Sequence, residues 1–371
     1  MLLKKLIISI ILIFCASISV CAADIPTVSA RSAVLINAET KEVIFEKNAY
    51  EKLSMASTTK IMTGIIAVES GRLTDIVTAN NIQTEGTSIG LEDGYKLILE
   101  DLVWGMMLES GNDAAELVAD YLAGNKDDFA VLMNNKAQEF GMLDSNFVTA
   151  SGLDSDGHYS TAYDMALLGA YAVNNPLLRK ICSTETKRVE FIEPAVVRYF
   201  SNHNRLLTMC DGVFGIKTGF TKKSGRCLVS ACERGEVELI AVTLNAANDW
   251  NDHIKLYDYG FDVCTSNAVY IRVPDTVKVY GGTSDSVTVT LSENPVEISQ
   301  SCTSEKITQR VLIPEFIYAP VKSGDVLGKV QLVQNGKVIC ERSILCGQTV
   351  DAIAPLPHKR SFFSKIKDLF N

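Results

Sequence analysis

The chain has 371 residues, of which 47% are hydrophobic and 21% charged, an ordinary composition for a globular protein with room for two domains. Its 44 acidic residues outnumber its 35 lysines and arginines, and the formal net charge is −9. A chain without a basic stripe cannot neutralise a row of phosphates, so no nucleic acid partner is expected.

The first 23 residues differ in character from the rest of the chain. Lys4 and Lys5 precede an apolar run over residues 6–14, and small residues follow at 21–23. This order is typical of a secretory signal peptide, because the apolar run is too short to be a confident membrane-spanning helix. An uncleaved membrane anchor is the alternative. The sequence therefore predicts export, with the protein acting outside the cytoplasm.

Residues 24–265 show strand patterns on both sides of a helical block. Apolar runs predict a hairpin over residues 33–37 and 42–46, after which Ser57 precedes an apolar helix. Mostly helical patterns follow over residues 97–181. Strands are then expected over residues 213–218, 226–232 and 239–244, with a helix near 249–261. A helical block between the strands of one sheet is an α/β arrangement, and we expect its cleft to lie between the sheet and the helices.

From about residue 273 the pattern changes to short, partly alternating apolar runs separated by Gly, Asp, Asn and Pro, which predict a small antiparallel β domain.

The tail begins with Pro355 and Pro357, and Ser361 can then cap a short helix. Residues 362–370 place aromatic and aliphatic side chains on one helical face with lysines beside it. This predicts an amphipathic helix on an anionic membrane surface. A docking helix or a frayed end is the alternative.

Eight cysteines follow the predicted signal peptide, and most are expected to be small buried apolar residues. Cys227 and Cys232 fall on opposite faces of one predicted strand, so they are not expected to bond to each other. The chain has no Cys-x-x-Cys pair and its four histidines are scattered. Neither a metal site nor a cofactor is therefore predicted.

Three short motifs carry candidate chemistry: Ser57-Thr58-Thr59-Lys60, Ser110-Gly111-Asn112 and Lys217-Thr218-Gly219. A serine hydroxyl is a poor nucleophile until a base takes its proton, and on a helix the lysine of the first motif shares a face with the serine. The second motif can present a hydroxyl and a carboxamide from a loop tip. The third is expected on an edge strand, where its lysine and hydroxyl can hold an anion. Taken alone, the first motif also fits a helix cap, the second a turn and the third a strand end. The catalytic interpretation therefore depends on the order and spacing of the three motifs.

The trio resembles the active site shared by penicillin-binding proteins and serine β-lactamases. The flanking residues 55–63 and 107–116 are similar to those of D-alanyl-D-alanine carboxypeptidases of the peptidase S11 type, the low-molecular-mass penicillin-binding proteins. Residues 151–153, 157–162 and 202–204 also look like that family, and the similarity runs from about residue 29 to about 350.

The resemblance implies a fold as well as a reaction. We expect a β-lactamase/transpeptidase-like catalytic domain, an antiparallel sheet with a helical insertion, followed by a small all-β domain that holds it away from the membrane. The expected boundaries are a signal peptide over 1–23, a serine DD-peptidase domain over 24–265, a β-rich domain over 266–350, and a linker with an amphipathic membrane-anchor helix over 351–371.

The family reaction implies that Ser57 attacks a terminal D-Ala-D-Ala amide with Lys60 as base, and that Ser110 passes a proton to the leaving D-alanine. The expected partners are a peptidoglycan stem peptide ending in D-Ala-D-Ala, β-lactams as covalent inhibitors, and the outer face of the cytoplasmic membrane. Backbone N–H groups of the nucleophile and Phe220 are expected to form the oxyanion hole. The expected catalytic residues are Ser57, Lys60, Ser110 and Lys217, and the expected substrate-binding residues are Asn112, Thr218, Gly219 and Phe220.

Three other functions remain open from the sequence. A β-lactamase would carry a deacylating glutamate followed by Leu-Asn, and the candidates Glu139, Glu185, Glu190 and Glu193 lack that sequel. A noncatalytic peptidoglycan or β-lactam receptor would have no need of the serines and lysines of the trio. A Ser-His-Asp scheme could use His158 or His203, but no Gly-x-Ser-x-Gly elbow accompanies either.

One departure from the family pattern concerns substrate recognition. Residues 245–249 offer no arginine of the sort that some relatives place near the substrate carboxylate. The sequence therefore predicts that carboxylate recognition rests on Lys217 and Thr218 alone.

Overall fold

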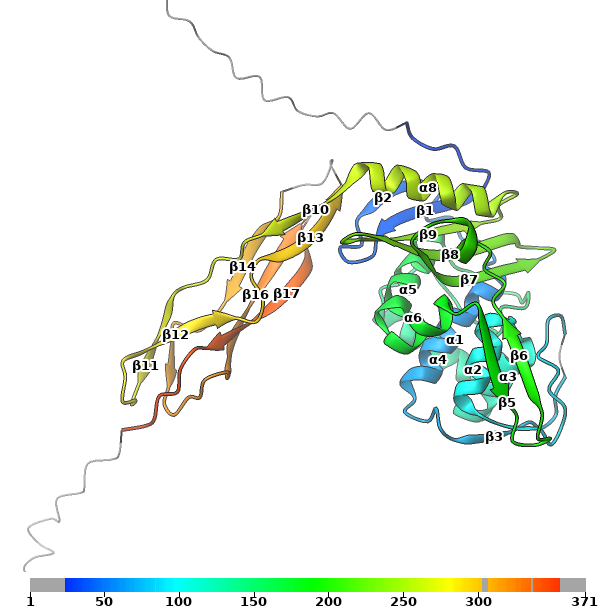
Figure 1. Ribbon diagram of the computed structural model, residues 1–371, viewed down its shortest axis with the longest axis horizontal. Coiled ribbons are helices and arrows are strands. Elements are labelled where there is room, and N and C mark those ends of the chain that lie inside the picture. The colour runs from blue at the N-terminus through cyan, green and yellow to red at the C-terminus, as the bar shows by residue number, and fades with distance from the viewer. Residues whose placement is uncertain (1–23, 84, 302–305, 335, 354–371) are drawn as a thin grey trace, which may run out of the picture.

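A computed structural model describes residues 24–83, 85–301, 306–334 and 336–353, which form a larger α/β domain followed by an elongated β domain (Figure 1). The first domain is built on a five-stranded antiparallel sheet of order β2-β1-β9-β8-β7. Its strands are β1 (Ser32–Asn37), β2 (Val43–Lys47), β7 (Val213–Thr221), β8 (Gly225–Arg234) and β9 (Val237–Leu244). The strand that carries Lys217-Thr218-Gly219 is therefore an edge strand, as predicted.

Both faces of this sheet are buried under helices, which explains why its strands are almost continuously apolar. Successive side chains of a strand point to opposite faces. In β1, Val34 and Ile36 belong to the core on the side of the helical block, whereas Ala33 and Leu35 belong to the core under α8 (Asp249–Val263). The sheet therefore lies between two helical layers, and each of its apolar faces is buried against one of them.

The helical block fills the chain between β2 and β7. It comprises the 3-10 turn η1 (Ala56–Thr59) and the helices α1 (Lys60–Glu69), α2 (Leu99–Leu108), α3 (Asn112–Ala123), α4 (Lys126–Glu139), α5 (Ala162–Asn174), α6 (Pro176–Ser183) and α7 (Leu206–Met209). Two ribbons join it: β3 (Ile76–Thr78) with β4 (Lys96–Ile98), and β5 (Thr186–Glu190) with β6 (Val197–Ser201). Capping side chains start several of these helices; Thr161 accepts a hydrogen bond from Asp164 N at 3.0 Å. The predicted antiparallel sheet with a helical insertion is confirmed.

The second domain consists of strands alone in its described part. They are β10 (Cys264–Val269), β11 (Thr276–Tyr280), β12 (Ser286–Leu291), β13 (Val296–Ser301), β14 (Thr308–Leu312), β15 (Phe316–Tyr318), β16 (Val326–Gln334) and β17 (Lys337–Cys346). Six form a sheet of order β14-β16-β17-β12-β11-β15, and β10 pairs with β13. The small β domain is confirmed and its described strand pairs are antiparallel as predicted, with one exception, the parallel pair β11 and β15. Alternation along single strands cannot reveal which distant strands pair, or in which direction.

Two predictions concern residues outside the described part of the chain. The signal peptide over 1–23 and the amphipathic helix after Ser361 both fall there. Across residues 24–353, apart from the few positions not described, no helix combines the length and the hydropathy needed to cross a membrane.

Candidate active site

Ser57 lies in the tight turn η1, immediately before α1 begins at Lys60. The cap position of α1 is Thr59, and no side chain makes a capping bond there. Ser57 is therefore not the helix cap that its position in the sequence also allowed. The turn starts at Ala56, which has φ of +49°, an unusual conformation for a residue with a Cβ. Local strain of this kind is maintained only where surrounding packing holds the backbone.

Lys60 is fully buried and contacts Ser57 directly. Its Nζ lies 2.9 Å from Ser57 Oγ, 2.6 Å from Asn112 Oδ1 and 2.7 Å from the carbonyl oxygen of Ser151. The last two oxygens only accept hydrogen bonds, whereas the serine hydroxyl can donate. A neutral amine has two N–H groups and one lone pair, so it satisfies all three neighbours when the lone pair faces the Ser57 hydroxyl.

The electrostatic surroundings favour that neutral amine. Burial is the main cause that holds the pKa of Lys60 well below its usual value, and the positive charge of nearby Lys217 lowers it further. Glu116 and Asp113 act in the opposite direction. The neutral state that a general base requires therefore follows mainly from the burial of Lys60, with the charge of Lys217 as a smaller contribution.

Two glycines allow backbone segments to approach the nucleophile closely. A Cβ on Gly152, which has φ of +83°, would lie 1.9 Å from the carbonyl oxygen of Ala56. A Cβ on Gly219 would lie 3.0 Å from the backbone nitrogen of Ser57. The turn that carries the nucleophile is therefore wedged between the loop at residues 149–153 and the edge strand β7.

The second motif bridges α2 and α3. Ser110 has φ of +61° and is 7% exposed, and Asn112 is the first residue of α3. The carboxamide of Asn112 is fixed at both ends, because its Nδ2 donates to the carbonyl oxygen of Glu85 at 2.7 Å while its Oδ1 accepts from Lys60. The loop-tip expectation for this motif agrees with the structure.

The three motifs meet at one cavity of about 300 Å³. Its lining residues are Ser57, Thr87, Ser110, His203, Thr218, Gly219, Phe220, Arg226, Asp249 and Trp250. Lys60 and Lys217 lie behind this lining, and Asn112 lines an adjoining cavity of about 700 Å³. Lys217 is 1% exposed, its Nζ donates to the carbonyl oxygen of Thr218 at 3.1 Å, and burial lowers its pKa to about 8. Five of the eight sequence-predicted site residues thus line this cavity, and the other three, Lys60, Asn112 and Lys217, lie close to them.

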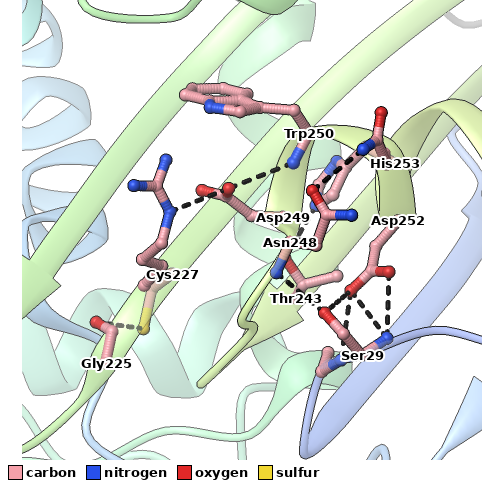
Figure 2. Close-up of polar contacts among 12 residues, drawn as sticks. Ser29, Gly225, Cys227, Thr243, Asn248, Asp249, Trp250, Asp252 and His253 are labelled. Atoms are coloured by element: carbon pink, nitrogen blue, oxygen red, sulfur yellow. Dashed lines mark hydrogen bonds and ion pairs between the residues drawn. The ribbon is translucent and has the colours of Figure 1, made fainter.

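The structure adds a cationic residue that the sequence reasoning missed. Arg226 pairs with Phe220 across the β7–β8 hairpin and its side chain lines the same cavity as Ser57. Its Nε donates to Asp249 Oδ1 at 2.9 Å, and its guanidinium carbon lies 5.6 Å from the ring centre of Trp250. Figure 2 shows Asp249 at the start of α8, bonded both to the guanidinium and to the backbone nitrogen of Trp250.

The expectation that Lys217 and Thr218 are the only groups available to a carboxylate is therefore corrected. An arginine was expected only in the segment after Leu244, whereas Arg226 comes from the neighbouring strand β8. The sequence does predict consecutive strands over residues 213–218 and 226–232, and antiparallel pairing of the two would bring Arg226 near the end of the Lys-Thr-Gly strand.

Neither candidate histidine is placed to activate Ser57. His158 is buried, its Nδ1 accepts from Val148 N at 2.9 Å, and its Nε2 lies 2.9 Å from Thr59 Oγ1. Burial lowers the pKa of His158 to about 4, so it is a neutral structural residue. His203 faces Glu109 at 3.5 Å. In the part of the chain that the structure describes, Lys60 is the side chain bonded to Ser57 Oγ.

Comparison with known proteins agrees with this geometry. Residues 19–248 match the family described as D-alanyl-D-alanine carboxypeptidase, and residues 262–352 match the family described as penicillin-binding protein 5, C-terminal domain. The chain belongs to the D-alanyl-D-alanine carboxypeptidase family. The predicted family, fold class and D-Ala-D-Ala carboxypeptidase function are confirmed.

Individual relatives in this family cover most of the chain. D-alanyl-D-alanine carboxypeptidase DacF of Bacillus subtilis is 30% identical over 331 residues, which are 85% of this chain and 84% of that protein. DacC of Escherichia coli is 31% identical over 375 residues, covering 93% and 88%. Among solved structures, penicillin-binding protein 5 from Haemophilus influenzae superposes with a TM-score of 0.66 at 26% identity, covering 88% of this chain and 98% of that one. The Streptomyces K15 DD-transpeptidase gives 0.61 at 27% identity, covering 64% and 99%.

The two buried lysines predict a bell-shaped dependence of penicillin acylation on pH. The rate rises with pH as Lys60 loses its proton, because the free amine is the base, and it falls above about pH 8 as Lys217 loses the charge that attracts the penicillin carboxylate. The measurement is the second-order rate constant of adduct formation, followed by intact mass across the pH range.

Lys217→Arg separates the two limbs of this profile. Arginine keeps its charge at alkaline pH, so the decline above about pH 8 disappears while the rising limb remains. A decline that persists in this variant, with an unchanged circular dichroism spectrum, would contradict the assignment to Lys217.

Proposed function

We propose that this protein removes the terminal D-alanine from peptidoglycan stem peptides through an acyl-enzyme on Ser57, and that it acts outside the cytoplasm. The observation that carries the proposal is the bonding of Lys60, whose two acceptor partners leave the lone pair of a neutral amine for the Ser57 hydroxyl. A buried base of lowered pKa can take the serine proton at neutral pH.

The remaining residues have roles that follow from their positions. Lys60 takes the proton as Ser57 Oγ bonds to the carbonyl carbon of the D-Ala-D-Ala amide, and the oxyanion is held by the backbone N–H groups of Ser57 and Phe220. Each such donor contributes a few kcal/mol of transition-state stabilisation, on the order of 3 kcal/mol. Ser110 passes the proton to the leaving D-alanine nitrogen, and water then hydrolyses the ester.

A β-lactam acylates the same serine. Because no deacylating glutamate is apparent in the sequence, the adduct is long-lived.

Ser57→Ala tests the proposed nucleophile. The change removes the only atom that can form the ester, so both the penicillin adduct and the release of D-alanine from a D-Ala-D-Ala peptide fall by at least about 1,000-fold. Intact mass and a D-alanine assay measure the two losses, and thermal melting shows that the fold is kept.

His203→Gln is the matched control, because His203 lines the same cavity without bonding to Ser57. It retains the adduct. If this variant loses acylation while folded, or if the alanine variant still forms an adduct, the Ser57–Lys60 scheme fails. Rapid loss of the wild-type adduct with many turnovers of penicillin would indicate a β-lactamase instead.

We further propose that Arg226 binds the terminal carboxylate of the substrate together with Lys217 and Thr218. Asp249 engages Nε, and among the described residues the two terminal nitrogens of the guanidinium make no hydrogen bond, although the side chain lines the cavity and is 44% exposed. These nitrogens can therefore donate to a carboxylate oxygen.

Arg226→Gln lowers kcat/KM for a D-Ala-D-Ala peptide by about 10- to 100-fold, the usual effect of a hydrogen bond to a charged group. The control is Lys223→Gln, which removes one positive charge from the exposed turn of the same hairpin and leaves kcat/KM within about twofold. A substrate with an amidated C-terminus loses little on the Arg226 change. Equal losses with the acid and the amide would show that Arg226 does not bind the carboxylate.

We propose that the chain divides into a catalytic unit over 24–265, a β-rich spacer over 266–350 and a tail over 351–371 that attaches to the outer face of the cytoplasmic membrane. Support comes from the residue ranges of the two family matches and from the amphipathic pattern of residues 362–370. The backbone nitrogen of Ile353 donates to the carbonyl oxygen of Gly281, at the end of the second domain remote from the sheet of the first (Figure 1). The tail therefore starts far from the active site.

Deletion of residues 361–371 abolishes cosedimentation of the mature protein with anionic liposomes, because the apolar face and the lysines beside it are removed together. A Lys365→Gln, Lys367→Gln double variant keeps the apolar face and binds more weakly, with less dependence on salt. Unchanged binding of the truncated protein would refute the anchor and leave the catalytic proposal intact.

A further inference from the structure

Cys210 and Cys232 lie outside the active site, on two segments of the chain that also carry residues lining its cavity. Cys210 directly follows α7, and Cys232 lies near the end of β8, opposite Val213 of β7. A backbone hydrogen bond from Glu233 N to the carbonyl oxygen of Gly212, at 2.9 Å, fixes the segment after α7 alongside β8. Residues 22 positions apart in the chain are thus held side by side by the edge of the sheet.

The two sulfur atoms lie beside one backbone oxygen. Cys210 Sγ is 3.9 Å and Cys232 Sγ 3.5 Å from the carbonyl oxygen of Asp211. Both side chains also belong to the apolar core under α8. Thiols that paired segments hold beside one carbonyl oxygen can be joined with little movement of the backbone.

The two thiols differ in reactivity. Cys210 is 8% exposed and its Sγ lies 3.6 Å from Arg234 Nη2, whereas Cys232 is completely buried. The hydrogen bond from Cys232 and the nearby guanidinium of Arg234 lower the pKa of Cys210, while the same contact raises the pKa of Cys232. A thiolate is the reacting species in disulfide exchange, so Cys210 attacks first and Cys232 second.

The other buried thiols provide a contrast. Burial raises the pKa of Cys182 to about 12 and that of Cys227 to about 11. Cys227 lies on the same strand as Cys232 but in the core on the opposite face. At both of these sites burial dominates and disfavours the thiolate, whereas at Cys210 the contacts with Cys232 and Arg234 outweigh burial and favour it as the attacking thiol.

We propose that Cys210 and Cys232 are a site of covalent modification, at which a disulfide joins the segment after α7 to strand β8. The oxidant is a small or protein-borne disulfide. The Cys210 thiolate attacks one of its sulfurs and expels a thiolate, and Cys232, having lost its proton, then attacks Cys210 Sγ and expels the second. Two protein thiols lose two electrons and two protons, and one external disulfide becomes two thiols.

The bond fixes one wall of the substrate cavity. The segment that contains His203, which lines the cavity, leads directly into α7, and β8 carries Arg226 on the same cavity. Export places the protein where disulfides persist. The inference depends on the proposed export only because export decides where in the cell oxidation occurs. It does not depend on the chemistry of Ser57.

The test uses purified mature protein, reduced with dithiothreitol and then equilibrated with oxidised and reduced glutathione. Free thiols are trapped with N-ethylmaleimide, and peptides are mapped by mass spectrometry without reduction. The expected product is a peptide pair linked through Cys210 and Cys232, lighter by two hydrogen atoms than the reduced pair. The oxidised protein melts about 4 °C or more above the reduced protein, because the link constrains the unfolded chain.

Cys210→Ser and Cys232→Ser each abolish the linked peptide and the difference in melting temperature, whereas the matched control Cys227→Ser keeps both. The mapping of the wild-type protein needs no variant, so a variant that fails to fold leaves the test decisive. Absence of the 210–232 link under oxidising glutathione, or a link through Cys227 instead, would overturn the proposal. Penicillin acylation is measured for both the oxidised and the reduced form. If Ser57 is acylated while the 210–232 link is absent, the disulfide proposal fails and the Ser57 mechanism stands.

Discussion

Two lysine side chains, Lys60 and Lys217, are buried near each other behind the nucleophile, and the rest of the active site accommodates this arrangement. Removal of a charge from water is costly, and two like charges in one apolar region raise the cost. The structure meets the cost by making the Lys60 site suitable for a neutral amine, with two fixed acceptors and one hydroxyl. Lys60 and Lys217 would destabilise the fold if both were charged. Because Lys60 is neutral, the pair is tolerated and the Lys60 amine can act as the base beside Ser57.

The acceptors that make this possible belong to different elements, which explains the helical insertion between the strands of the sheet. Asn112 begins α3, and the Ser151 carbonyl belongs to the loop before α5, whereas Lys60 begins α1. Backbone contacts at Gly152 and Gly219 press the Ser57 turn between that loop and β7. The nucleophile is thus positioned by packing from both the helical block and the sheet, and neither half could hold it alone.

In its described part, the second domain contributes no side chain to this chemistry. None of the side chains that line the cavity comes from it, and its cores are separate from those of the first domain. Its last described residue, Ile353, bonds beside β11 at its far end (Figure 1). A β-rich element between the tail and the catalytic domain fits the proposed attachment of the tail to a membrane, because it separates the tail from the catalytic domain.

The sequence by itself determined the family, the main strands and helices of the first domain and eight residues in or beside the cleft, because these depend on local periodicity and on short motifs with their spacing. Only the tertiary structure decided how those residues are bonded. Lys60 acquires its acceptors from residues 52 and 91 positions away, His158 turns to Thr59 and not to the nucleophile, and an arginine enters the cavity from the neighbouring strand. The parallel pairing of β11 with β15 and the placement of Cys210 and Cys232 beside the carbonyl oxygen of Asp211 have the same origin. Contacts between distant segments depend on which strands and loops pack together, and no pattern within a single segment records that choice.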